Sequence, residues 1–271
     1  MMRVKFYKPI NETLKKFIKG YYFFLEKDEY DSICYWTFPN NYNIVSVTQN
    51  VSIIKRDNKI MITPSKEKNI FSHITYRYDT PIEIFYEKPL NEITIYFEPL
   101  GLNFFTDKVE VYYSKDNTKE VEFDPFPDFK KEMEKIFSIQ EREKQIEQLE
   151  DYWLSKFVHK DVSMIKELIA DIEANAKIEE VAKKHKISRQ YLNKIFQKNI
   201  GKSPSEYRKI HRFRKSITDK NQVKNLTELS YENLFYDQSH FVKDFRDLTF
   251  KSPKTFFEKI NTERETVWFF P

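Results

Sequence analysis

The sequence is poor in glycine and cysteine. Three glycines stand in 271 residues, so the glycine-rich loops that cradle phosphates or hold strained nucleophiles have almost nothing to be built from. A single cysteine, Cys34, excludes an internal disulfide and is typical of a reducing compartment. Its place between Ile33 and Tyr35 in an expected strand predicts a buried core thiol.

Long apolar runs and metal-ligand spacings are lacking as well. No apolar stretch reaches the length of about 18 residues that a membrane helix needs, and the chain opens without the apolar segment of a signal peptide. The five histidines show no zinc-ligand spacing with one another or with Cys34. We therefore expect a cytoplasmic protein that does not enter a membrane, uses no cofactor or metal and is not an enzyme.

Charge is unevenly distributed along the chain. Residues 1–160 carry 24 basic and 26 acidic side chains, whereas residues 161–271 carry 22 and 16. Between Lys183 and Lys224, fourteen Lys or Arg residues stand against only two acids. Because phosphate contacts from such a surface dominate affinity for DNA, attraction to nucleic acid is expected in the C-terminal part.

A short sequence pattern occurs twice between Ile178 and Ile260. In each copy an apolar stripe at i, i+3, i+4 is followed by a helix-capping residue, Ser188 or Asp237, and then by a second amphipathic helix. The inward faces are expected to hold Ile178, Val181, Ala182, Tyr191, Leu192, Ile195 and Phe196 in the first copy, and Leu226, Leu229, Phe241, Val242, Phe245 and Leu248 in the second. Each copy predicts a helix-turn-helix, and each is followed by Lys-Ser-Pro.

The second helix of each copy leaves a polar face free. That face carries Arg189, Gln190, Asn193, Lys194 and Gln197 in the first copy, and Gln238, Ser239, His240, Lys243 and Asp244 in the second. Arg and Lys donate to guanine, and Asn and Gln pair with adenine, in the major groove of double-stranded DNA. Any solvated helix face is polar, but its repetition with the same following element favours DNA reading.

These motifs resemble the DNA-binding domain of AraC/XylS-type transcriptional regulators. The resemblance rests on IGKSPSEY (200–207) and YDQSHFVKDF (236–245) and covers roughly residues 161–262. It implies two reading helices joined by a long central helix from Ser205 to about Lys220. By position it assigns base contacts to Gln190, Asn193, Lys194, Gln238, Ser239, His240 and Lys243, and a phosphate contact to Arg189.

The sequence departs from this family at three turn positions. Lys186, Leu234 and Phe250 stand where the family has glycine, which alone adopts a left-handed backbone cheaply. Drift away from glycine along the whole chain is the simpler explanation. The departure nevertheless favours one alternative, a protein-interaction or ligand-binding module whose helix-turn-helix pair no longer reads sequence.

The N-terminal part has a different pattern. Residues 9–25 predict a short helix capped by Asn11 and stopped at Gly20 before an aromatic strand. Seven short runs rich in β-branched and aromatic residues follow between Ser32 and Glu98 and predict a small barrel or sandwich. Two helical segments come after Asp128.

The pattern as a whole predicts an α+β chain of two domains. Residues 1–158 form the β-rich domain with flanking helices, and residues 159–271 form the all-α double helix-turn-helix domain. FPNN (38–41) and FEPLGLNFF (97–105) resemble the sensing or dimerising domain found in a bacterial subgroup of these regulators. A small-molecule effector of the N-terminal domain and a homodimer are therefore expected partners beside DNA.

A stripe of four apolar residues leaves the route to a dimer open. Ile146, Leu149, Trp153 and Phe157 fall near heptad spacing over two heptads. They could pair two protomers or pack on their own domain. The aromatic end of the chain, VWFFP (267–271), is expected to dock on the N-terminal domain or on a partner.

Overall fold

The computed structural model describes residues 5–24, 32–88, 90–113, 121–220, 229 and 238–259. The chain separates into two compact units. Unit 1 comprises residues 1–34, 42–76 and 84–160, and unit 2 comprises residues 35–41, 77–83 and 161–271. The main division thus falls between Lys160 and Asp161, and two short segments of the N-terminal half belong to unit 2.

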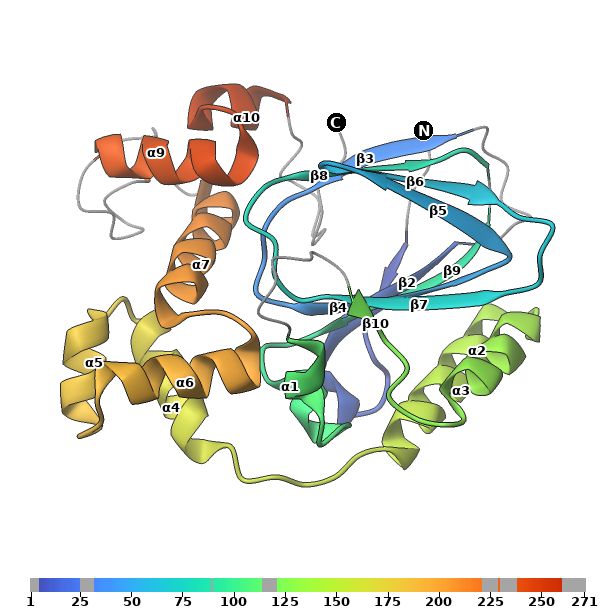
Figure 1. The fold of residues 1–271 in the computed structure, drawn as a ribbon, viewed down its shortest axis with the longest axis horizontal. Helices are drawn as coiled ribbons and strands as arrows, with labels where there is room; N and C mark the ends of the chain where they lie inside the picture. The colour runs from blue at the N-terminus through green and yellow to red at the C-terminus, as the bar shows by residue number, and fades with distance from the viewer. Residues whose placement is uncertain are drawn as a thin grey trace. The chain divides into compact units, whose positions relative to one another are not determined.

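Two antiparallel sheets form the β-rich part of the chain (Figure 1). The larger sheet has the order β1-β2-β9-β4-β7-β10, with strands Phe6–Tyr7, Ile18–Phe24, Asn91–Phe97, Asn43–Gln49, Ile70–Thr75 and Val121–Glu122. The smaller sheet has the order β3-β8-β6-β5, with strands Ile33–Thr37, Ile82–Tyr86, Lys59–Pro64 and Val51–Arg56. Strands β3 to β9 confirm the seven runs expected between Ser32 and Glu98.

Alternation along the strands builds the core of unit 1. In β9, Ile93, Ile95 and Phe97 share one face and are fully buried, opposite Val45 and Val47 of β4. The other face of the larger sheet meets the smaller sheet, since the rings of Phe24 in β2 and Tyr86 in β8 lie 5.2 Å apart. β-branched and aromatic residues suit this pleated surface.

Two N-terminal predictions were wrong in detail. The expected helix is a single 3-10 turn, η1 (Leu14–Lys16), and the chain already enters β2 at Ile18 and continues past Gly20, with a shift of register against β9 between Ile18 and Gly20. Cys34 is exposed rather than buried. Side chains alternate along β3, so burial of its neighbours Ile33 and Tyr35 turns Cys34 outward.

The helices of unit 1 cover the larger sheet. Beside η1, the helices described there are η2 (Gly101–Phe104), α1 (Val109–Tyr112), α2 (Phe129–Ser138) and α3 (Arg142–Ser155). The apolar stripe of α3 packs on its own unit, because Trp153 is buried with its ring 4.9 Å from that of Phe97. Ile146 and Leu149 are buried there too. This stripe is therefore not available for pairing two protomers.

The described residues of unit 2 are helical apart from the two short N-terminal segments, which confirms the expected α+β class. The helices described there are α4 (Ser163–Glu173), α5 (Ile178–Lys184), α6 (Arg189–Ile200), α7 (Pro204–Asp219), α9 (Gln238–Thr249) and α10 (Pro253–Lys259). α7 corresponds to the expected central helix. No helix within the described ranges is long and apolar enough to span a membrane.

Candidate nucleic-acid interface

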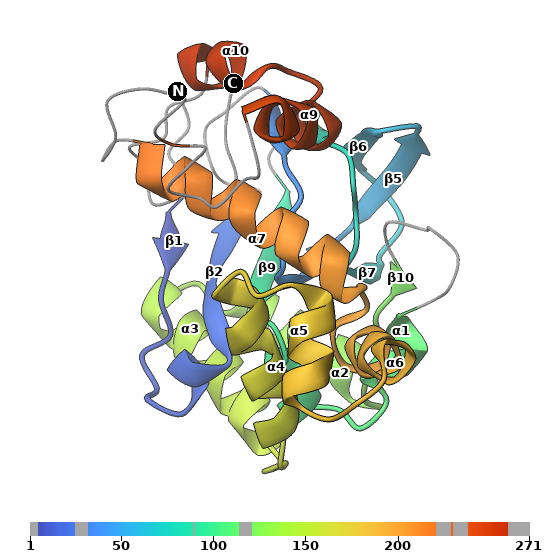
Figure 2. The same cartoon turned by 90° about the vertical axis from the view of Figure 1, so that its left-hand side faces the viewer.

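The first helix-turn-helix consists of α5, a tight turn and α6. Each of the two helices has a buried face. It consists of Val181 and Ala182 in α5, and of Leu192 and Phe196 in α6. The Ser188 hydroxyl accepts a hydrogen bond from the Tyr191 amide at 3.1 Å, so it caps α6 as expected. Figure 2 shows this helix pair below α7.

The outer face of α6 carries the expected base-facing side chains. Gln190, Asn193 and Lys194 are all exposed. Arg189 is exposed too, and its Nη1 lies 3.1 Å from Oε1 of Glu179 in α5. An exposed pair of this kind contributes little stability, so Glu179 can release Arg189 to a phosphate.

One inward assignment on α6 was wrong. Tyr191 is 49% exposed, and Ile195 is only half-buried. At 100° per residue, Leu192, Phe196 and Ile200 form the buried stripe, and Tyr191 lies on the opposite side of the helix. The outer face therefore includes an aromatic ring beside Lys194.

The junction of α6 and α7 is closely built. α6 ends at Gly201, whose φ of 75° is left-handed. The Ser203 hydroxyl then accepts from the Glu206 amide at 3.2 Å, and the Glu206 carboxylate accepts from the Ser203 amide at 3.0 Å, forming a capping box for α7. Lys202, between Gly201 and Ser203, is fully buried. Burial lowers the pKa of its ammonium to about 7.

Glu206 also anchors one of the N-terminal segments of unit 2. Arg77 Nε donates to its Oε1 at 2.8 Å. Burial would raise the pKa of Glu206, but hydrogen bonds from Ser203 and the Arg77 guanidinium outweigh this effect and lower it. Glu206 is therefore a carboxylate that caps the central helix and ties residues 77–83 to it.

The second reading helix, α9, presents only part of its predicted set outward. Gln238, Ser239 and Lys243 are exposed. His240 is half-buried, with Nε2 3.9 Å from Oδ1 of Asp244. Asp244, expected on the free face, is 6% exposed instead. It turns inward because Lys209 and Arg212 of α7 lie there.

A pocket of about 490 Å³ runs along the outer side of α9. It is lined by Gln238, Ser239, Val242, Lys243, Arg246 and Asp247. Val242 was expected inside but is half-buried at this surface, and the exposed Arg246 was not singled out by sequence. Its spacing of three residues from Lys243 places it on the same face and could have identified it. The expected cap Asp237 and the residues Leu226, Leu234 and Tyr236 lie outside the described residues.

The turn positions without glycine keep a left-handed backbone. Lys186, in the turn of the first helix-turn-helix, has a φ of 55°, and Phe250, after α9, has a φ of 58°. The geometry that glycine normally provides is thus retained at these two positions at some cost in strain. The missing turn glycines therefore give less support to the alternative in which the helix-turn-helix pair no longer reads sequence.

The central helix α7 lies between α4, α5 and α6 on one side and α9 and α10 on the other (Figures 1 and 2). Towards α4, the hydroxyl of Tyr207 donates to Glu173 at 2.6 Å and His211 lies 3.4 Å from the same carboxylate. Burial would raise the pKa of Glu173, but these two hydrogen bonds outweigh it and lower the pKa. Towards α9, the rings of Phe213 and Phe245 lie 5.1 Å apart.

A segment of the N-terminal half completes the core of unit 2. Phe38 is 2% exposed and packs its ring 5.1 Å from that of Phe256. Arg214 donates to the carbonyls of Phe38 and Pro39, the latter at 2.8 Å. Sequence patterns gave no sign of this, because the segment reads as the end of a strand and is far from α7 along the chain.

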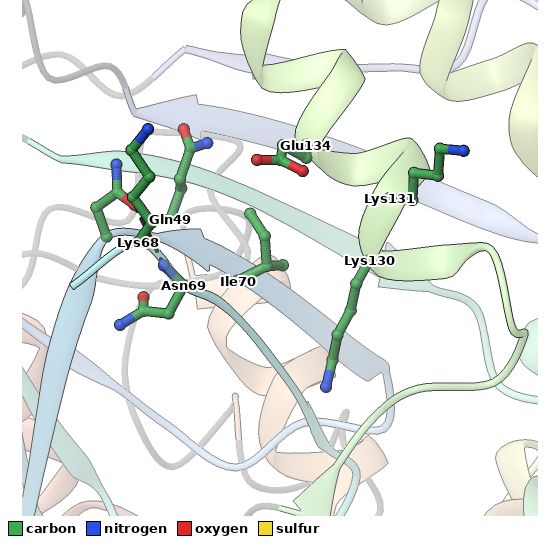
Figure 3. Close-up of a pocket in the computed structure, with 8 residues that line it drawn as sticks. Gln49, Lys68, Asn69, Ile70, Lys130, Lys131 and Glu134 are labelled. Atoms are coloured by element: carbon green, nitrogen blue, oxygen red, sulfur yellow. Dashed lines mark hydrogen bonds between the residues drawn. The ribbon is translucent and has the colours of Figure 1, made fainter.

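A second surface feature lies in unit 1 (Figure 3). This pocket of about 450 Å³ is lined by Gln49, Asn50, Lys68, Asn69, Ile70, Lys130, Lys131 and Glu134. Lys130 is paired with Glu122 at 2.9 Å and with Asp124 at 3.4 Å. With Lys68 and Glu134 the pocket offers both signs of charge to a small polar molecule. The described residues contain no group of three or more acidic, His or Cys side chains that could hold a metal.

The C-terminal part of the chain is similar to a known domain family. Residues 181–259 match the family model of a helix-turn-helix domain. Comparison with curated proteins gave no significant match. Among solved structures, ToxT from Vibrio cholerae is similar at 13% identity and a TM-score of 0.43, covering 88% of this chain and 96% of that chain. Unsaturated fatty acid bound ToxT from strain SCE256 is similar at 11% identity and a TM-score of 0.42, covering 98% and 100%.

Proposed function

We propose that the chain is a sequence-specific transcriptional regulator of the AraC type, which reads two successive major grooves with α6 and α9; the match of residues 181–259 to the family model of a helix-turn-helix domain supports this proposal. One observation carries the proposal. Two helices with exposed polar faces are attached to the same central helix α7, each through its own buried face. This arrangement presents two reading surfaces on one chain.

The chemistry of the two faces suits base edges. Gln190 and Asn193 on α6, and Gln238 on α9, can each pair bidentately with adenine, and Lys194 and Lys243 can donate to guanine. Successive major grooves on one side of the duplex lie about 34 Å apart. One chain would thus read two unlike half-elements, and two chains would read a pair of such sites.

Positioning on the backbone falls to the surrounding cations. Arg189 stands at the start of α6, where the helix N-terminus also favours a phosphate. Arg246 lies at the edge of the outer face of α9 and adds a second such cation. Contacts of this kind raise affinity for any sequence and make it salt-dependent.

Selection of DNA from a random pool by the full chain tests the proposal. The full chain is needed because Phe38 belongs to the core of unit 2, so a fragment that begins at residue 159 would lack part of that core. We expect an enriched motif with two elements about one helical turn apart, bound far more tightly than its scramble at two salt concentrations. Binding that depends on salt but not on sequence would refute sequence reading.

We further propose that unit 1 regulates this activity, by sensing a small molecule or by joining two chains. The pocket of Figure 3 supports the first role, since it offers room and both signs of charge in a part of the chain remote in sequence from α6 and α9. Lys68→Ala and Glu134→Ala should change transcription of a reporter in cells without changing the affinity of the purified chain for its site. Unchanged reporter activity in both variants would remove the pocket from the proposal. Sedimentation with a duplex of two sites tests whether two chains bind together.

A further inference from the structure

The buried carboxylate of Asp244 is the most unusual group on the second reading helix. Arg212 Nη2 donates to its Oδ2 at 3.1 Å, and Lys209 Nζ lies 3.4 Å from its Oδ1. The side chains of Arg212 and Asp244 are 12% and 9% exposed. An acid that pointed outward on a DNA-facing helix would repel phosphates. Asp244 instead points inward, where it lies between two cations of α7.

The apolar contacts between α7 and α9 are less directional than a salt bridge. Phe213, Phe241, Phe245 and Leu248 pack together with Phe256, and such contacts are non-directional. The carboxylate differs because its two oxygens face two different cations on one side of α7. Arg212 and Lys209 are three residues apart and so lie on the same face of that helix.

We propose that Asp244 is a positioning residue, which fixes the rotation of α9 about its own axis against α7 and thereby sets which side chains and which spacing the second reading helix offers to DNA. This inference rests on the proposed function. Asp244 and Lys243 are consecutive and about 100° apart around the helix. With Asp244 held towards α7, Ser239 and Arg246 are held on the opposite side of α9, and Lys243 lies beside them.

The consequence is a spacing requirement. α6 and α9 are attached to one helix, so a fixed rotation of α9 sets the angle between its outer face and that of α6. One base pair more or fewer between the half-elements turns one of them by about 35° relative to the other. A chain with a fixed α9 should therefore reject changed spacing.

The test uses the full chain and duplexes in which the two selected half-elements are separated by different numbers of base pairs. The decisive variant combines Asp244→Leu with Arg212→Met, which removes the ion pair and fills its space with apolar groups, a change that is often neutral or stabilising. Lys209 keeps a partner in Asp247 at 2.7 Å. Asp171→Asn on α4 is the matched control, since it also removes a carboxylate that is paired with a lysine of unit 2, Lys184 at 2.6 Å, and it lies outside α7 and α9.

We expect wild type and the control to lose at least about tenfold in affinity when the spacing changes by one base pair, and the double variant to lose less than about threefold, while its Tm stays within a few degrees of wild type. A stable double variant with the wild-type spacing profile would overturn the inference. A double variant that does not fold would also overturn it, because the cluster would then serve stability alone. If wild type shows no preference for sequence at all, the proposed function itself fails, and that outcome is distinct from both.

Discussion

The ends of α6 and α9 follow the same backbone course with different residues. α6 ends at Gly201 with a φ of 75°, and α9 is followed by Phe250 with a φ of 58°. Each is followed by Lys-Ser-Pro, whose serine caps the next helix: the Glu206 amide donates to Ser203 at 3.2 Å, and the Thr255 amide donates to Ser252 at 3.2 Å. The fold thus imposes the left-handed turn even where a Phe must adopt it.

The two junctions differ in what surrounds them. At the first, Lys202 is fully buried and Glu206 is tied to Arg77. At the second, Lys251 is only half-buried and Thr255 stands where the first copy has Glu206. The second helix-turn-helix depends instead on the aromatic core that includes Phe38. The repeat therefore conserves backbone geometry, and each copy stabilises it with different side chains.

The largest expected effect is a loss of stability that falls mainly on the second copy. Phe38→Ala should lower the free energy of unfolding by about 3–5 kcal/mol, because a buried ring against Phe256 is lost and a cavity remains. Amide hydrogen exchange should rise more in α9 than in α6, since Phe38 packs in the core shared by α7, α9 and α10. Equal loss of protection in both helices would contradict this division.

A pH titration should distinguish the two lysines of the repeated motif. The pKa of Lys202 falls from its ordinary value of 10.5 to about 7 on folding. The unfolded chain therefore binds more protons between these values, and the free energy of unfolding should rise by about 1 kcal/mol per pH unit as pH increases from about 7 towards 10. Below pH 7 this contribution is lost. In urea unfolding at several pH values, Lys202→Met should remove this slope, whereas the half-exposed Lys251→Met should keep it.

Base reading can be compared between the copies by single substitutions. Asn193→Ala on α6 and Gln238→Ala on α9 should each cost about 1–3 kcal/mol of discrimination, confined to the half-element that its helix reads. Arg189→Ala should weaken binding to all sequences alike and reduce the salt dependence. Fluorescence anisotropy with the selected and scrambled duplexes measures both. Equal losses on both duplexes for Gln238→Ala would show that α9 does not read bases.

The smallest effect sharpens the comparison of Gly201 with Phe250. Phe250→Gly should stabilise the chain by about 1 kcal/mol, because a left-handed backbone costs glycine nothing and the exposed ring loses little burial. Phe250→Ala serves as the control, since alanine keeps the backbone cost without the ring. Thermal unfolding of the three proteins measures the difference. An equal Tm for the glycine and alanine variants would place the effect in the side chain.

Local pattern was sufficient for most elements of the chain. Short runs rich in β-branched and aromatic residues between Ser32 and Glu98 identified strands β3 to β9, and the 3.6-residue period identified α5, α6 and α9. The central helix α7 was expected only from the family resemblance. Local pattern failed where one residue had two plausible environments. Tyr191 has an aromatic side chain, which suits a core, but it is exposed. Asp244 has a charged side chain, which suits a surface, but it is buried.

The sequence by itself determined helices α6 and α9, the Ser188 cap of α6 and the basic character of the C-terminal part, because these depend on residues close together in the chain. Tertiary structure alone decided that Phe38 joins the core of unit 2, that Lys202 is buried and that Asp244 faces Arg212. The physical reason is the same in each case. A local period shows which side of an element is apolar, whereas the partner of a buried charge or ring comes from elsewhere in the fold.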